Sequence, residues 1–215
     1  SIILLIISIN VNYLADPNYE GKDLRSLPLV IEAQYKAIEE IPYSGIAATT
    51  DLGNPTCIHP QKKQDIGQRL AFLALKNDYG VEGLPAPAPT FKSFVRDGKK
   101  MILSFNNVSK EYDWNNPNSF KGYSDDGYIK PKGFEIAGSD GIYYPAESNY
   151  QWWKNTIEVW SDSIDNPVAV RYAFKNYCRD ANVVTLLGQP LRNKMIPVNI
   201  VMVKLQCKHG KIVFI

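Results

Sequence analysis

The chain has few of the residues that hold metal ions. Among 215 residues there are two histidines and three cysteines, and Cys57, Cys178 and Cys207 are widely spaced with no Cys-x-x-Cys pair. Zinc sites are built from closely spaced cysteines and histidines, so we expect no metal centre. The spacing is compatible with one disulfide and a free thiol, or with three buried thiols, and it leaves the redox compartment open.

The chain also lacks a strong charge bias and a membrane-spanning run. Its formal net charge is +2, and no block of lysine and arginine provides the electrostatic footprint that binds nucleic acid. Residues 1–9 are mostly apolar, but a transmembrane helix needs about 20 residues. They also lack the positive start of a signal peptide. We therefore expect neither a nucleic-acid nor a membrane partner.

Residues 1–84 alternate between strand and helix patterns. A continuous apolar run at Ile2–Ile9 predicts a strand buried on both faces, and a β-branched run at Ile46–Thr50 predicts a second strand. Between them, apolar residues at helical spacing predict a helix over Ser26–Glu40, with Ser26 as N-cap. This order favours an α/β domain with a parallel sheet. Because the chain begins inside the first strand, we expect it to be part of a longer protein.

The second predicted helix follows a loop that contains one of the two histidines. The helix extends to about Asn77, Gly80 closes it, and Arg69 lies on its polar face. Pro60 suits the first helical position, which makes His59 the predicted N-cap. The apolar stripe of this helix consists of Ile66, Leu70, Leu73 and Ala74.

Residues 85–215 are predicted to form an all-β domain. The Pro-rich segment Leu84–Pro89 is interpreted as an extended linker, and no helical pattern of usable length follows it. Seven short runs with β character, separated by turn signals such as Asp126-Gly127, favour a β-sandwich. These runs are Lys100–Phe105, Gly133–Ala137, Gly141–Tyr144, Asn155–Trp160, Val168–Phe174, Val198–Leu205 and Lys211–Ile215.

His59 is the main candidate for catalysis. A loop between a strand and a helix is a common place for catalytic groups, and the positive end of a helix dipole disfavours a protonated imidazole. His59 would then be neutral near pH 7, as a general base must be, and Asp51 is the candidate for orienting it. The alternative is that His59 only caps the helix and Asp51 only caps a turn. His209 is interpreted as a solvated turn residue.

Several aromatic and charged residues of the β half are candidates for ligand contact. Trp152 and Trp153 are consecutive, so a strand would turn one inward and leave the other for a surface or ligand contact. We expect Arg171 to pair with a carboxylate of the protein rather than with a sugar acid. Core packing is the expected role of Trp160 and Tyr144.

Several blocks of the sequence resemble, in the same order, one enzyme family. They are Asp51-Leu-Gly53, Ile58-His-Pro60, Gly67-Gln-Arg-Leu-Ala71, Gly133-Phe-Glu-Ile-Ala-Gly138, Tyr144-Pro-Ala146 and Pro167-Val-Ala-Val-Arg-Tyr-Ala173. The first three are similar to the histidine region of sialate O-acetylesterases, which are carbohydrate esterases of the SGNH hydrolase superfamily. The last three are similar to the C-terminal β region of that family.

The resemblance implies both a fold and an activity. Residues 1–84 would be the C-terminal part of an SGNH-type, flavodoxin-like three-layer α/β domain, and residues 85–215 a β-sandwich domain. The activity would be removal of O-acetyl groups from sialic acid or related carbohydrates, without metal or organic cofactor. His59 would take the proton from a serine that attacks the acetyl carbonyl. The family also implies an extracytoplasmic location, which is periplasmic, secreted or lysosomal.

The nucleophile of the family has no counterpart in these 215 residues. It lies in a Gly-Gln-Ser-type turn, whereas the Gly-Gln pairs at Gly67 and Gly188 are followed by other residues. We therefore expect a preceding polypeptide to supply the serine, or the chain alone to be inactive in hydrolysis. Many SGNH enzymes carry an acid three residues before the histidine. That position is Thr56 here, which leaves Asp51 as the nearest acid in the loop.

A second hypothesis comes from a different functional class. The chain would be a non-catalytic carbohydrate-binding or interdomain β-sandwich module with a remnant α/β half. The two hypotheses differ on whether His59 has a serine within hydrogen-bond reach, in the same chain or from a partner.

Overall fold

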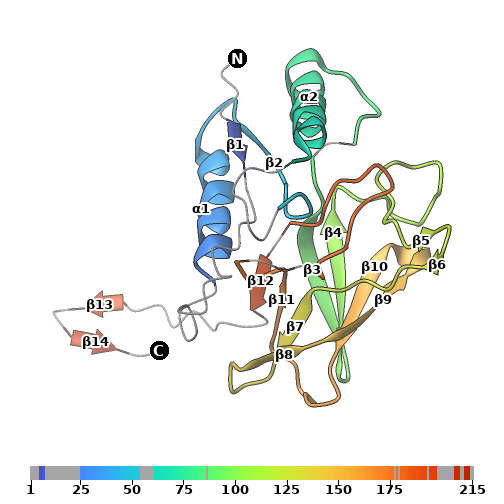
Figure 1. The fold of residues 1–215 in the computed structure, drawn as a ribbon. Helices are drawn as coiled ribbons and strands as arrows, with labels where there is room; N and C mark the ends of the chain where they lie inside the picture. Colours follow the sequence, from blue (N-terminus) through green and yellow to red (C-terminus); the bar gives the residue numbers. More distant parts are fainter. Residues whose placement is uncertain are drawn as a thin grey trace.

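The computed structural model describes residues 5–7, 25–53, 61–85, 87–176, 178, 180–192, 194–197, 206–208 and 211–213. In the view of Figure 1, the helix at residues 63–79 lies above the larger β-sheets and the helix at residues 26–40 lies beside them. Most of the regular structure in these ranges is β-sheet. Within the same ranges, neither helix combines the length and apolarity that crossing a membrane requires.

The helices accompany a small parallel sheet. Strand β1 (Leu5–Ile7) pairs in parallel with β2 (Gly45–Ala47), with Ile6 opposite Ile46. Helix α1 (Ser26–Glu40) connects the two strands, and α2 (Lys63–Tyr79) follows the second. The predicted order of strand, helix, strand and helix is confirmed.

The apolar faces of the two helices pack against β2. Ile31 and Tyr35, one turn apart on α1, form a buried cluster with Ile46. Leu73 of α2 packs on Ala47. Each of these five residues is at most 7% exposed, and full burial of a large apolar side chain contributes about 1.5–3 kcal/mol. The helical spacing in the sequence therefore marks the face that meets the strand.

The start of α2 differs from our prediction. The helix begins at Lys63 with Lys62 at the N-cap, so the prediction that Pro60 opens the helix and His59 caps it is wrong. Proline is tolerated in the first turn of a helix, but its presence does not make a helix begin there. Helices are stabilised mainly by their packed face, which begins here at the buried Ile66.

The other helix ends follow the sequence more closely. Ser26 is the first helical residue of α1 and Arg25 is its N-cap, so the predicted cap is displaced by one residue. Pro28 lies in the first turn, where its missing N–H has no helical partner to lose. At the end of α2, Gly80 is in the left-handed conformation with a φ of 66°, which glycine adopts without a steric penalty.

Two four-stranded antiparallel sheets form most of the remaining structure. The first has the order β3-β4-β10-β9 and the second the order β12-β11-β7-β8. The strands of the first sheet span, in that order, Thr90–Asp97, Lys100–Asn106, Thr156–Trp160 and Glu147–Gln151. Those of the second span Lys194–Pro197, Ala169–Tyr172, Phe134–Ala137 and Tyr143–Pro145.

Short elements complete the described structure. A hairpin joins β5 (Tyr123–Ser124) to β6 (Gly127–Tyr128), and a 3₁₀ turn lies at Trp152–Lys154. Near the C-terminus, β13 (Gln206–Lys208) pairs with β14 (Lys211–Val213). Figure 1 shows this second hairpin extending away from the sheets.

The two large sheets share one hydrophobic core. Along β4, Met101, Leu103 and Phe105 are buried and alternate with less buried residues, as expected for a strand with one face inward. Ile136 of β7 and Val170 of β11, from the other sheet, are fully buried in the same cluster. The inner faces of the two sheets therefore pack against each other.

The predicted β runs agree in part with the strands. The sequence predicts β4, β7, β8, β10, β11 and β14 to within a few residues, but it misses β3, β5, β6, β9, β12 and β13. The predicted run Val198–Leu205 lies outside the described residues. Strands β3 and β9 are the edges of the first sheet, where exposed polar side chains weaken the apolar pattern.

The Pro-rich segment Leu84–Pro89 is not a solvated linker. Pro85, Ala88 and Pro89 are buried. The Asn107 side-chain amide donates to the Ala88 carbonyl at 3.0 Å, and the Arg192 N–H donates to the Pro89 carbonyl at 3.1 Å. Packing therefore overrides the expectation from composition, and a domain division between residues 84 and 85 stays a prediction.

Candidate active site

A buried arginine fixes the loop that follows β2. Arg69 of α2 is 7% exposed. Its Nη1 donates to Asp51 Oδ1 and to the Ala48 carbonyl, each at 2.7 Å. Its Nη2 donates to Asp51 Oδ2 at 2.6 Å and to the Gly188 carbonyl at 2.7 Å. One guanidinium therefore joins α2, the loop after β2 and the loop that contains Gly188.

The interaction between Arg69 and Asp51 is a strong one. Two parallel N–H to carboxylate bonds form the bidentate, charge-assisted arrangement for which the guanidinium fork is suited. The side chain of Arg69 is 8% exposed and that of Asp51 25%, so the cation is the more deeply buried partner. The sequence places Arg69 on the polar face of its helix, but it is buried there because its partners come from distant parts of the chain.

The loop between Ala48 and Gly53 is a compact turn. The Leu52 N–H donates to the Thr49 carbonyl at 3.0 Å. Thr49 is 2% exposed, and its hydroxyl has no hydrogen-bond partner within the described part of the chain. This turn lies at the carboxyl end of a parallel strand, the edge at which α/β sheets place their ligand sites.

Of the two sequence-predicted site residues, the structure describes Asp51 but not His59. Asp51 lies at the carboxyl edge of β2 with its carboxylate bound to Arg69. His59 and His209 lie outside the described residues, so the pairing of His59 with Asp51 stays a prediction. In the chain, His59 lies between Gly53 and Gln61, and Arg69 links the elements on either side of that interval.

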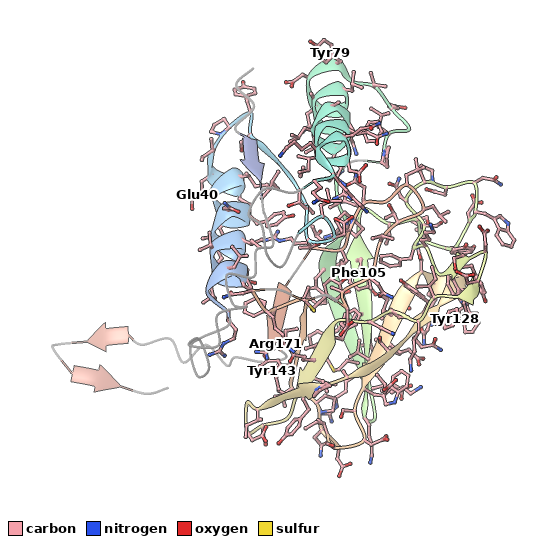
Figure 2. The ribbon with its side chains drawn as sticks, viewed as in Figure 1. Glu40, Tyr79, Phe105, Tyr128, Tyr143 and Arg171 are labelled. Atoms are coloured by element: carbon pink, nitrogen blue, oxygen red, sulfur yellow. The ribbon has the colours of Figure 1, made fainter. Side chains whose placement is uncertain are left out.

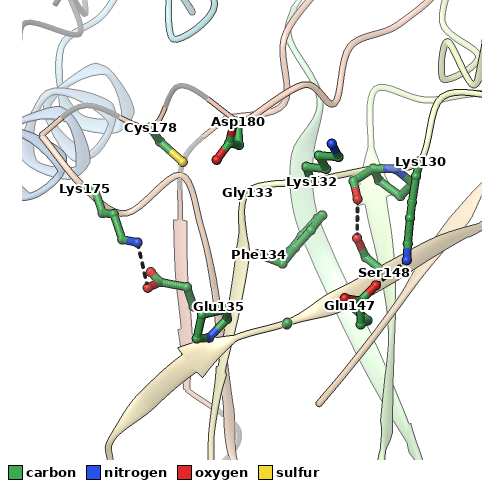
Figure 3. A pocket seen from close by; sticks show the side chains of 13 residues that line it. Lys130, Lys132, Gly133, Phe134, Glu135, Glu147, Ser148, Lys175, Cys178 and Asp180 are labelled. Atoms are coloured by element: carbon green, nitrogen blue, oxygen red, sulfur yellow. Dashed lines mark hydrogen bonds and ion pairs between the residues drawn. The ribbon is translucent and has the colours of Figure 1, made fainter. Parts of the chain in front are cut away.

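A second polar site is a cavity of about 440 Å³ beside β7 (Figure 3). Lys130 and Glu147 form an ion pair at its rim, and the Ser148 hydroxyl donates to the Pro131 carbonyl at 2.5 Å. The volume is within the range of small-molecule sites, about 300–1,000 Å³. The charged residues of the lining are Lys130, Lys132, Lys175, Glu135, Glu147 and Asp180. Three cations and three carboxylates give a polar, balanced lining that suits a ligand rich in hydroxyl groups.

Glu135 is the most heavily bonded acid of this cavity. Arg171 Nε donates to its Oε2 at 2.7 Å, and Lys175 Nζ lies 3.1 Å from its Oε1, as Figure 3 shows for the lysine. Arg171 also lies over the Tyr143 ring. The expectation that Arg171 pairs with a carboxylate of the protein is confirmed. Glu135 itself was not predicted, because only the antiparallel register of β7 and β11 places it opposite Arg171.

The cavity contains a thiol that is unsuited to nucleophilic attack. Cys178 is unpaired and lines the cavity. Burial raises the pKa of its thiol, which keeps the sulfur protonated and weakly nucleophilic at neutral pH. The raised pKa therefore argues against Cys178 as a nucleophile at neutral pH.

The stability contributed by Glu135 is expected to depend on pH. Burial alone would raise the pKa of this carboxyl, but hydrogen bonds from Arg171 and Lys175 outweigh it and lower the pKa below its ordinary value of 4.5. The ionised form is therefore favoured by folding, and its contribution is present above pH 4.5 and lost as the pH falls through the lower, folded value. At pH 7, Glu135→Gln is expected to cost about 2 kcal/mol of unfolding free energy.

Urea unfolding of both proteins at a series of pH values measures this effect. The difference in unfolding free energy between the native chain and Glu135→Gln should be largest near neutral pH and should shrink below pH 4.5. A difference that is the same at pH 7 and pH 3 would show that the carboxylate charge is not what stabilises the fold.

The consecutive tryptophans have different environments. Trp152 is half-buried among tyrosine rings, whereas Trp153 is 71% exposed. The expectation that one faces inward and one outward is confirmed, although they lie in a 3₁₀ turn rather than a strand.

The chain is similar to a solved enzyme structure. No protein-family model matches the chain, and no curated protein matches it either. A solved structure described as a novel carbohydrate acetylesterase from Xanthomonas citri superposes with a TM-score of 0.71 at 32% sequence identity. The alignment covers 89% of this chain and 40% of that protein. The similarity is to a carbohydrate esterase. The chain spans two fifths of that enzyme's length.

Proposed function

We propose that this chain is the part of a serine-type carbohydrate esterase that carries the general base, and that the enzyme removes O-acetyl groups from sialic acid or a related carbohydrate. The observation that carries the proposal is the similarity to a carbohydrate acetylesterase over 89% of the chain at 32% identity. The family-like blocks in the sequence, which include the histidine loop, support the same activity.

The proposal includes the architecture of the whole enzyme. Residues 1–84 would complete an SGNH-type, flavodoxin-like α/β domain, and residues 85–215 would form a β-sandwich domain beside it. The parallel pairing of β1 and β2 and the shared core of the two larger sheets support this division. The enzyme would act outside the cytoplasm.

His59 is the proposed general base. It would accept the proton of a serine hydroxyl as the serine oxygen attacks the acetyl carbonyl carbon. The sugar oxygen would then leave with that proton, and the acetyl group would remain as an ester on the serine. Water, deprotonated by the same imidazole, would hydrolyse this ester and release acetate. The chemistry requires no metal or organic cofactor.

Asp51 is the proposed partner of His59. A carboxylate has about four lone-pair positions, and Arg69 occupies one on each oxygen. Among the bonds of the described residues, this leaves a position on either oxygen for an imidazole N–H. In this proposal Arg69 is a positioning residue, because it holds Asp51 without contacting the substrate.

The serine would come from a polypeptide that precedes residue 1. Ser148 and Cys178 both line the described cavity, but the Ser148 hydroxyl donates to the Pro131 carbonyl and burial raises the pKa of the Cys178 thiol. The sequence also has no Gly-Gln-Ser turn. The chain also spans only 40% of the esterase that it resembles, which leaves room in such an enzyme for a separate nucleophile segment.

Labelling with a fluorophosphonate tests this function. The natural polypeptide that contains residues 1–215 is treated with the reagent, and acetate release from acetylated sialic acid and from acetylated xylan is measured before and after. We expect one labelled serine outside residues 1–215 and loss of acetate release. Acetate release that survives complete labelling would exclude a serine mechanism. Absence of any acetate release from the untreated polypeptide would favour the non-catalytic module.

A further inference from the structure

A group of aromatic side chains lies at the edge of the first large sheet, and none of its members is among the residues that line the 440 Å³ cavity. We call it the aromatic patch. Its central ring is Trp152, which has Tyr112, Tyr123 and Tyr128 at centroid distances of 4.9, 5.2 and 5.9 Å. Trp114 extends the group from Tyr112 at 5.9 Å. All five rings therefore form one connected set.

The backbone around the patch holds these rings in place. The Tyr112 N–H donates to the Trp152 carbonyl at 3.1 Å. The Tyr128 hydroxyl bonds the Asn149 side chain and accepts the Tyr150 N–H at 3.3 Å. Gly122 passes beneath Trp152 so closely that a Cβ at this position would overlap the six-membered ring of the indole. The patch is therefore ordered before any ligand arrives, which reduces the entropy cost of binding.

Much of the ring surface of the patch faces solvent. Trp114 is 78% exposed, Tyr123 51% and Tyr128 43%. Figure 2 places Tyr128 at the outer edge of the sheet. A contiguous set of exposed aromatic rings is unusual on a protein surface and indicates a binding surface.

The surroundings of the patch indicate what kind of ligand it binds. The segment 112–128 carries three aspartates, Asp113, Asp125 and Asp126, and a single lysine, Lys121. Stacking on nucleic-acid bases requires a positive groove that follows the phosphates, and this segment has a net negative charge. Exposed amide and carboxylate groups, including Asn115 and Asn149, instead offer hydrogen bonds to hydroxyl groups.

A pyranose ring matches this combination. One face of the sugar presents C–H groups that pack on an aromatic ring, while its hydroxyl groups point outward to polar partners. An uncharged sugar also avoids repulsion from the aspartates.

We propose that the aromatic patch binds uncharged pyranose residues of a glycan chain. The choice of a glycan rests on the proposed esterase function. The patch then deepens that function, because it assigns the enzyme to acetylated neutral polysaccharides in preference to free sialic acid.

Affinity electrophoresis of the 215-residue chain tests the patch without any catalytic step. Native gels contain soluble deacetylated xylan, hydroxyethylcellulose or galactomannan. The double variant Trp114→Ala with Tyr123→Ala removes two exposed rings and is expected to raise the dissociation constant at least tenfold in the gel that retards the native chain. Tyr79→Ala is the matched control, because Tyr79 is 77% exposed at the end of α2, far from Tyr128 (Figure 2). It should bind as the native chain does.

A second variant tests the preformed arrangement. Gly122→Ala displaces the Trp152 ring and is expected to weaken binding as strongly as the double variant. Gly67→Ala is its control, because nothing lies within 4 Å of a Cβ at Gly67. Thermal unfolding of each variant shows whether the fold is kept, and the double variant carries the test if Gly122→Ala does not fold.

The outcomes separate this inference from the proposed function. Retardation by none of the three polysaccharides, or equal retardation of the native chain and the double variant, would overturn the glycan assignment of the patch. Equal or tighter binding of polysialic acid through the same residues would overturn the preference for uncharged rings. Patch-dependent binding by a polypeptide that releases no acetate would count against the esterase function alone.

Discussion

Arg69→Ala is expected to lower the free energy of unfolding by about 4 kcal/mol. The substitution removes four hydrogen bonds, to both Asp51 oxygens and to the carbonyls of Ala48 and Gly188. Removing one partner of a buried ion pair costs about 3–5 kcal/mol, because the remaining groups are left without partners. Asp51 is a quarter exposed, which lets water recover part of that loss.

The effect should extend to the candidate active site. Without Arg69, the loop after β2 and the loop at Gly188 lose their shared contact. We expect acetate release by the natural polypeptide to fall at least tenfold at a temperature at which the variant remains folded, because Asp51 is no longer held. A variant that keeps full activity while losing stability would show that the ion pair is structural only.

Urea unfolding of Arg69→Ala, Asp51→Ala and the double variant measures the stability effect. The losses should be strongly non-additive, since the two residues share one interaction. Lys99→Ala is the control, because its ion pair with Asp165 is largely exposed, at 60% and 73%, and such pairs add little to stability. Losses from Arg69→Ala and Asp51→Ala that simply add would contradict a direct coupling.

Local patterns in the sequence were sufficient for α1, for the end of α2 and for the central strands of the two large sheets. The bounds of α1 follow from apolar residues at helical spacing, and Gly80 ends α2 as expected. Strand β4 alternates buried and less buried residues because one face meets the core. In each case, the apolar residues that form the sequence pattern are also the residues that are buried in the core.

Edge strands were harder to predict. In β3, Phe91 and Phe94 pack against the core, but a register shift between Phe91 and Ser93 breaks the alternation of two. In β9 only Ser148 and Tyr150 are buried. Neither run has the regular apolar pattern on which a sequence-based prediction of a strand depends.

Long-range contacts account for the features of the site that the sequence did not reveal. The helical pattern places Arg69 on a polar face and says nothing of its partners, one of which, the Gly188 carbonyl, is 119 residues away. The sequence around Gly122 does not indicate that a glycine is needed there, because the need comes from the Trp152 ring, which leaves no space for a Cβ. The pairing of Glu135 with Arg171 depends on strand register. No local pattern contains these partners.

His59→Ala is expected to have the largest effect on activity. A serine and its base act as a unit, so loss of the base should lower kcat of the natural polypeptide at least about 10³-fold. KM should change little, because the imidazole acts on the serine and contributes little to binding of the ground state. Added imidazole should restore part of the activity of His59→Ala, since the missing group is a base of that chemistry. Its stability should stay near that of the native polypeptide.

The chain itself offers the matched control, because it has only one other histidine, His209. The decisive measurement is the rate of acetate release from an acetylated carbohydrate by the natural polypeptide with either histidine replaced by alanine. The esterase account predicts that His59→Ala loses activity at least about 10³-fold and that His209→Ala keeps the native rate. A native rate for His59→Ala, or equal losses for both variants, would contradict His59 as the base.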